Sequence, residues 1–299
     1  MFLQQVINGL TLGGVYAIIA LGYTMVYGIL ELINFAHGEI YMLGAYLGII
    51  FLGIFTALGV TAASLPLSLF LTLLLTVFFC AAYGFTMEKV AYKPLRNAPR
   101  LSPLISAIGV SLFLQNYVML TQGATDRVFP ARFGEGRITI LNGEITLLQV
   151  LIIAVSALIM LSLHLFRKTR WGKAMRAATQ DKTMAALVGI NVDGVISLTF
   201  VIGAALAAVA GVMVAAYYGL VNHFIGYVAG IKAFAAAVLG GIGSIPGAML
   251  GGILLGLVES TGAAYLSSEY KDAYAFAILL IILLLKPSGI LGRHTEEKV

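Results

Sequence analysis

The segment INFAHGE, residues 33–39, brings together polar side chains that could do chemistry between two apolar stretches. Asn34, His37 and Glu39 offer hydrogen-bond donors, acceptors and two titratable groups. A carboxylate at the centre of a bilayer costs about 2.5–3.5 kcal/mol on insertion scales. We therefore expect Glu39 at an interface, paired, or facing water. The three residues are candidates for lining or gating a pathway; the alternative is a structural turn whose polar groups are satisfied by neighbours.

The His-x-Glu spacing of His37 and Glu39 could also suggest a metal site or acid–base catalysis. No further cluster of His, Cys or Asp residues accompanies it, which argues against both. The sequence also contains no G-x-x-x-x-G-K-[ST] phosphate loop, so ATP hydrolysis by that route is not expected. We expect no catalytic residue, metal or cofactor in this chain.

A second polar group follows the apolar residues 195–219. It consists of Asn222, His223 and Lys232, which are further candidates for a pathway. Lys232 stands within an apolar stretch, so its ammonium group must extend to the polar surface or find a partner.

Residues 167–191 form a basic, polar stretch that is unlike the rest of the chain. Asp181 can cap a short helix over residues 182–188, with Gly189 at its C-terminal end. So short a helix cannot stabilise itself, and its apolar face needs either a groove in another protein or the membrane surface. We assign this surface to Gly172, Asp181, Met184, Ala185, Leu187, Val188 and Gly189.

Small residues recur at four-residue spacing in two apolar stretches. On a helix starting after Pro246, Gly243, Gly247 and Gly251 would form one flat face, and Gly203, Ala207 and Gly211 would form a similar one. Small residues at this spacing allow membrane helices to pack closely. Close packing is the simpler interpretation, and a moving seam beside the pathway is the alternative.

The composition identifies the elements that must position these residues. The chain has 299 residues, of which 60% are hydrophobic and 10% charged. A soluble domain carries roughly 25% charged residues, so we predict a single all-α polytopic membrane domain over residues 1–299. The first Lys or Arg is Lys89, so a cleaved signal peptide is not expected. We expect eight or nine membrane segments, some short or broken, near residues 10–30, 40–57, 63–87, 101–122, 147–166, 195–219, 228–242, 246–264 and 273–285.

The charges between the segments predict an orientation. Basic residues dominate residues 88–100 and 167–182, which we expect in the cytoplasm. Residues 123–146 carry balanced charges and residues 259–272 are acidic, so both are expected outside. The external loop 123–146 could contain a hairpin around Asn142 and Gly143. The C-terminus is then cytoplasmic, whereas the side of the N-terminus stays open.

Several long motifs together resemble a known family. They include INFAHGEIYMLGAY, GKAMRAATQDKTMAALVGIN, KAFAAAVLGGIGSIPGAMLGGILLG and EYKDAYAFAILLIILLLKPSGILGR. The chain resembles the inner-membrane permease subunits of bacterial branched-chain amino acid ABC importers from residue 8 to residue 293.

The resemblance implies a multi-pass subunit of the bacterial inner membrane. Its partners would be a second related permease, two cytoplasmic ATPase subunits that bind ATP and Mg²⁺, and a periplasmic protein that delivers leucine, isoleucine or valine. It also implies that residues 172–190 fit a cleft in an ATPase subunit, so that residues 167–191 form a cytoplasmic coupling loop.

Two other classes of transporter fit part of the sequence. A related branch that carries urea or short amides shares an element like INFAHGE, although the C-terminal motif fits the amino-acid branch better. A self-powered secondary transporter or channel fits the composition equally well, but the predicted docking loop and the few charged residues within the apolar segments disfavour it. An intramembrane enzyme using His37 and Glu39 is a third, weaker hypothesis.

Overall fold

A computed structural model describes residues 2–96, 98–99, 101–130, 136–140 and 143–292 of the chain. Nine apolar helices dominate this described part, and each coincides with one of the segments predicted from the sequence. Seven of them are long and apolar enough to cross a membrane, and α10 and α12 are shorter. The nine are α1 (Phe2–Leu30), α2 (His37–Ala57), α4 (Leu65–Met87), α5 (Leu101–Gln122), α6 (Leu147–Phe166), α9 (Val192–Tyr218), α10 (Ile225–Gly240), α11 (Ile245–Tyr265) and α12 (Lys271–Leu285).

Short elements connect these helices. A π-helical turn η1 (Glu88–Tyr92) and a 3-10 turn η2 (Lys93–Leu95) extend α4, and α3 (Val60–Ala63) precedes it. Two small helices, α7 (Arg170–Gln180) and α8 (Lys182–Leu187), lie between α6 and α9. The strands are β1 (Arg127–Val128), β2 (Arg137–Ile140), β3 (Gly143–Thr146) and β4 (Leu220–Val221).

The strands form two antiparallel pairs. β2 and β3 make the predicted hairpin, in which Ile140 pairs with Gly143. Gly143 is therefore the first residue of a strand, and Asn142 lies outside the described residues. β1 pairs with β4, which joins the predicted external loop to the end of α9; the sequence analysis did not anticipate this long-range contact.

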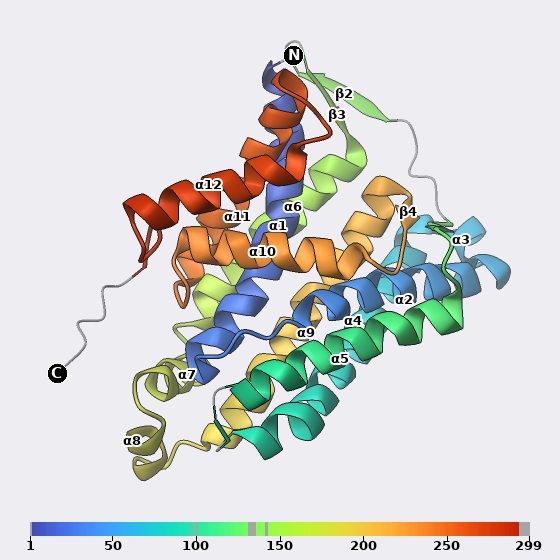
Figure 1. Ribbon diagram of the computed structural model, residues 1–299. Coiled ribbons are helices and arrows are strands. Elements are labelled where there is room, and N and C mark those ends of the chain that lie inside the picture. Colours follow the sequence, from blue (N-terminus) through green and yellow to red (C-terminus); the bar gives the residue numbers. More distant parts are fainter. Residues whose placement is uncertain (1, 97, 100, 131–135, 141–142, 293–299) are drawn as a thin grey trace.

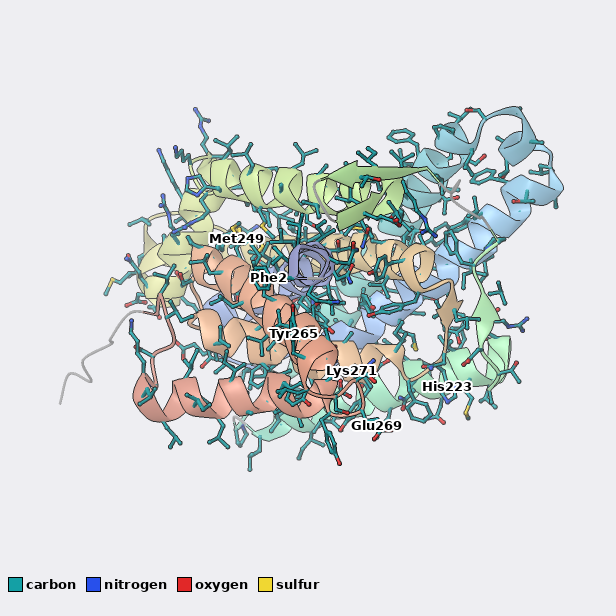
Figure 2. All side chains as sticks on the ribbon, turned by 90° about the horizontal axis from the view of Figure 1, so that it is seen from above. Phe2, His223, Met249, Tyr265, Glu269 and Lys271 are labelled. Carbon is teal, nitrogen blue, oxygen red and sulfur yellow. The ribbon has the colours of Figure 1, made fainter. Side chains whose placement is uncertain are left out.

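The molecule has two ends, which we call the hairpin end and the α8 end (Figure 1). The hairpin end holds the start of α1 and the β2–β3 hairpin, joined where the backbone N–H of Glu144 donates to Gln4 Oε1 at 2.9 Å. The α8 end holds α7 and α8. Figure 2 looks down on the hairpin end, with Phe2 of α1 near the centre and Tyr265, Lys271 and His223 to one side of it.

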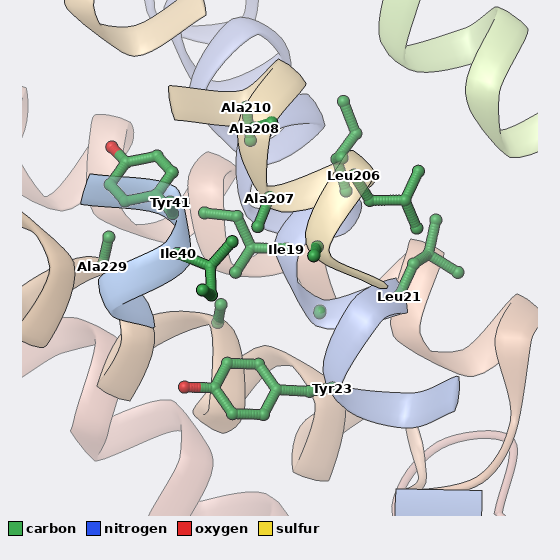
Figure 3. Close-up of a cluster of buried hydrophobic side chains, with 14 of the residues drawn as sticks. Ile19, Leu21, Tyr23, Ile40, Tyr41, Leu206, Ala207, Ala208, Ala210 and Ala229 are labelled. Atoms are coloured by element: carbon green, nitrogen blue, oxygen red, sulfur yellow. The ribbon is translucent and has the colours of Figure 1, made fainter. Parts of the chain in front are cut away.

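The hydrophobic core lies around α1 and α9, which bury most of their residues. Ile19 and Leu21 of α1, Ile40 and Tyr41 of α2, and Leu206 of α9 meet there (Figure 3). In contrast, α4, α5 and α6 leave most of their apolar side chains exposed or half-buried. A water-facing surface of that kind would be unstable, whereas lipid is as apolar as leucine, so these helices are suited to face the bilayer.

Glycine allows α1 and α11 to pack closely in the core. A Cβ atom on Gly13 would lie 2.8 Å from the Cα atom of Ile253, and Gly252 and Gly256 face the backbone of α1 in the same way. Side chains at these positions would push the two helices apart. The sequence analysis did not select this set of glycines.

The glycines that the sequence analysis did select fall into two groups. Gly247, Gly251 and Gly211 each lie against the backbone of a neighbouring helix, and Gly203 lies at ordinary contact distance, with its notional Cβ 3.6 Å from Gly22 O. Gly243 differs, because it lies in the turn before α11 with a φ of 87° and nothing near its notional Cβ.

The helix start explains the wrong placement of Gly243. Ser244 caps α11 by accepting a hydrogen bond from the backbone N–H of Gly247 at 3.2 Å, and Pro246 occupies the first turn. Gly243 is needed for the left-handed backbone of the turn, and the helical repeat begins only at Gly247.

Candidate functional site

α8 has well-defined ends. Asp181 Oδ1 accepts hydrogen bonds from the backbone N–H groups of Thr183 at 2.8 Å and Met184 at 2.9 Å. At the other end Gly189 has a φ of 85°, and the backbone N–H of Ile190 donates to Ala185 O at 3.0 Å. The local signals in the sequence therefore coincide with the helix in the structure, one residue shorter than predicted.

α8 projects from the body of the protein with its apolar face uncovered (Figure 1). Met184 is 59% exposed, Leu187 75% and Val188 76%, whereas Ala185 is buried. Exposed apolar side chains on so small a helix gain stability only when another surface covers them. This face is the feature of the α8 end that a partner could bind.

α7 holds α8 in place. Its Met175 and Ala178 are buried, and Gly172 lies against the carbonyl of Phe166, where a side chain would not fit. Thr169 caps α7 by accepting a hydrogen bond from the backbone N–H of Gly172 at 3.3 Å. α7 thus connects α8 to the end of α6 and contacts α1 and α9 as well.

The INFAHGE residues come together where the turn after α1 leads into α2, and all three are buried. Tyr92 donates to Asn34 Oδ1 at 2.6 Å, and Ser111 donates to Glu39 Oε1 at 3.1 Å. His37 packs edge-on against Tyr23, with the ring centroids 4.7 Å apart. The Glu39 Oε2 atom has no hydrogen-bond partner among the described residues. Glu39 is therefore only partly satisfied, which keeps both the pathway and the structural-turn interpretations open.

Lys232 forms ion pairs inside the protein and does not extend to the surface. Its Nζ lies 2.7 Å from Glu259 Oε1 and 2.5 Å from Asp272 Oδ1. The Tyr16 hydroxyl donates to Glu259 Oε2 at 2.9 Å and lies 3.4 Å from the Lys232 Nζ. Four helices, α1, α10, α11 and α12, contribute to this cluster of Tyr16, Lys232, Glu259 and Asp272, which we call the Lys232 cluster.

The partners of Lys232 are not predicted from the sequence. The charge pattern assigns Glu259 to an acidic external connection, but this residue lies within α11 and is 3% exposed. Two signals were present: a lysine and a glutamate each inside an apolar segment, where each needs an opposite charge.

A cavity of about 460 Å³ adjoins the Lys232 cluster. Asn222 and Lys232 line it, while His223 is buried beside it against Phe224. Asn34, His37 and Glu39 do not line this cavity. The predicted pathway residues thus lie at the starts of two helices that pack against each other, since a Cβ atom on Gly226 of α10 would lie 2.5 Å from Glu39 Oε2.

A second charged network lies near the α8 end. Arg96 binds both the buried Glu88 and Asp193, and Lys93 Nζ lies 2.9 Å from Asp193 Oδ2. Ser197 donates to Glu88 Oε2 at 2.8 Å. The network ties the end of α4 to the start of α9. Among the described residues, no group of three or more His, Cys, Asp or Glu side chains could hold a metal ion.

Comparisons with known proteins give a consistent result. The family model described as "Branched-chain amino acid transport system / permease component" matches residues 5–283. The high-affinity branched-chain amino acid transport system permease proteins LivH of Salmonella typhimurium and of Escherichia coli K12 are each 52% identical over 303 residues, covering 100% of this chain and 98% of theirs. The permease protein BraD of Pseudomonas aeruginosa is 51% identical with the same coverage. No solved structure matches the chain significantly.

Proposed function

Because this chain belongs to the family of permease components of branched-chain amino acid transport systems, we propose that it is the membrane-spanning subunit of an ATP-driven importer for leucine, isoleucine and valine. The identity of about half of all residues over the full length of relatives with that named substrate class supports the proposal. The chain is a multi-pass membrane protein, and we place it in the bacterial inner membrane.

The exposed apolar face of α8 is the observation that supports a mechanism coupling ATP hydrolysis to transport. Met184, Leu187 and Val188 would enter a groove in a cytoplasmic ATPase subunit, in the manner of a helix bound in a groove. Closure of an ATPase pair around ATP and Mg²⁺ would then move α8, and α7 would pass the movement to the spans as a rigid-body shift. ATP hydrolysis belongs to the partners, so this chain acts as a transport subunit and not as an enzyme.

The orientation follows from placing α8 in the cytoplasm. The hairpin end then faces the periplasm and carries the N-terminus, because Gln4 binds Glu144 of the hairpin. Nine consecutive segments would alternate in direction, with α10 and α12 as short crossings. Residues 289–291 contact the end of α10, whose following turn shares a pocket with Arg167 and Gly172, so the C-terminus would be cytoplasmic.

The importer would need four further subunits. A second related permease would complete the path, two ATPase subunits would bind at the α8 end, and a periplasmic binding protein would deliver substrate at the hairpin end. The described β1–β4 pair and β2–β3 hairpin provide the ordered surface for that delivery.

Uptake into proteoliposomes tests the proposal. The vesicles would contain this chain, the partner permease and the ATPases, with ATP inside and binding protein outside, and labelled leucine and urea would be compared. ATP-dependent uptake of leucine is the expected result. Uptake of urea alone would move the chain to the branch that carries urea or short amides, and leucine uptake without ATP would identify a self-powered transporter.

A further inference from the structure

The cavity of about 460 Å³ next to the Lys232 cluster has the size of a small-molecule site. It lies where the first turns of α10 and α12 meet α1, α2 and α9, on the hairpin-end side of the core. The α8 face does not line it, and neither do Asn34, His37 and Glu39, so none of these residues explains this cavity.

The polar wall of the cavity places two carboxylates around the single buried ammonium group of Lys232. Glu259 and Asp272 both contact Lys232, so two carboxylates share one ammonium group. The side chains of Lys232 and Glu259 are 4% and 5% exposed, whereas that of Asp272 is 50% exposed. A pair that served only to neutralise Lys232 would need one carboxylate. The second carboxylate, at the accessible edge, is suited to bind a further cation.

A positive group stands beside this surplus carboxylate. Lys271 lines the same cavity, is exposed, and forms no ion pair in the described part of the chain. It is the first residue of α12, which begins without a side-chain cap. The free N–H groups of an uncapped helix start favour an anion, as does the lysine. The cavity therefore presents a carboxylate and an ammonium group side by side.

The rest of the lining is mostly apolar. It includes Leu12, Val214, Ile225 and Val228, and the ring of Tyr218. Such a wall excludes a strongly hydrated ligand and favours a branched aliphatic group.

We propose that this cavity is a binding site for the free branched-chain amino acid within the permease itself. The ligand's ammonium group binds Asp272 beside Glu259, its carboxylate binds Lys271 and the start of α12, and its aliphatic side chain lies against Leu12, Val214 and Val228. The proposal rests on the proposed function, because it names the place where the imported substrate pauses after delivery. Short helices whose ends meet at a binding site are a recurring feature of transporters.

The test measures binding to the assembled complex of both permeases and both ATPases in nanodiscs, without the binding protein. Labelled leucine is the probe, and 4-methylpentanoate and 3-methylbutylamine, which lack the amine and the carboxylate respectively, compete with it. Leucine should bind about ten- to a hundredfold more tightly than either analogue, which corresponds to one lost hydrogen bond to a charged group. Absence of leucine binding, or equal affinity for all three, would overturn the proposal.

Two reciprocal variants assign the ends of the ligand. Asp272→Asn should weaken leucine about tenfold or more but leave 4-methylpentanoate unchanged. Lys271→Gln should weaken leucine similarly but leave 3-methylbutylamine unchanged. Lys271 is exposed, and Lys232 keeps its ion pair with Glu259 when Asp272 is replaced, so neither change leaves a buried charge alone. Glu269→Gln, an exposed residue of the same connection, is the matched control and should bind as the wild type does.

Uptake by the wild-type complex distinguishes failure of the proposed function from failure of the proposed binding site. If ATP-driven leucine uptake is absent, the proposed function fails. If uptake is present and both variants bind leucine as tightly as the wild type, the importer stands and only this site is wrong. Binding-protein-stimulated ATP hydrolysis by each variant shows that the complex has assembled.

Discussion

Replacing Leu187 by aspartate should uncouple transport without unfolding the permease. The Leu187 side chain is 75% exposed, so the folded protein loses little by the change, within about 0.5 kcal/mol. Full burial of a leucine side chain contributes about 1.5–3 kcal/mol of free energy. Because Leu187 is 75% exposed in the permease alone, about three quarters of this free energy can still be gained when a partner covers the side chain. The loss is therefore about 1–2 kcal/mol, which is roughly five- to thirtyfold in affinity. A carboxylate facing an apolar groove adds a desolvation cost to this.

The assay compares ATP hydrolysis and leucine uptake in the same proteoliposomes. Leu187→Asp should insert in the membrane like the wild type, yet its ATP-driven uptake should fall by about tenfold or more. Lys182→Asp is the matched control, because Lys182 starts the same helix on the side facing away from Met184 and is exposed. Uptake by Leu187→Asp equal to that of Lys182→Asp would refute the assignment of this face to an ATPase.

Three further predictions concern other parts of the structure. Asp181→Ala removes the acceptor of two hydrogen bonds and about 1 kcal/mol of helix stability, so uptake should fall, whereas Asp181→Asn should keep the cap and the uptake. Glu39→Gln keeps the shape and an acceptor for Ser111 but removes the charge, so uptake should fall more than the yield of membrane protein; wild-type uptake would make Glu39 a structural residue. Gly252→Ala puts a methyl group on the backbone of α1 and should destabilise the protein by about 1–3 kcal/mol, measured as a lower Tm; Gly109→Ala, where nothing lies within 4 Å, should not lower the Tm.

Features that depend on neighbouring residues along the chain could be predicted from the sequence. The apolar segments follow from the length a helix needs to cross the hydrocarbon core, and all nine are helices in the structure. The bounds of α8 follow from Asp181 and Gly189, because helix caps involve residues only two to four positions apart. The hairpin at residues 137–146 is equally local.

Predictions from the sequence were wrong where the same local pattern occurs in more than one kind of structure. Gly243 continues the four-residue glycine spacing, but Ser244 and Pro246 start the helix after it. Glu259 is one of the acidic residues counted between positions 259 and 272, yet it is helical and buried. Counting residues cannot distinguish a glycine in a turn from one in a helix, or a loop carboxylate from a paired one.

The sequence alone determined that this is an all-helical membrane protein with one polar, capped helix outside the apolar segments, since composition and capping act over short distances. Only the tertiary structure decided which helices touch and which charges meet. Lys232 lies 216 positions from Tyr16 and 27 from Glu259, and no periodicity in the chain relates them. They meet because the glycine contact between α1 and α11 draws these helices together, and because an unpaired charge inside the bundle would be too costly to bury.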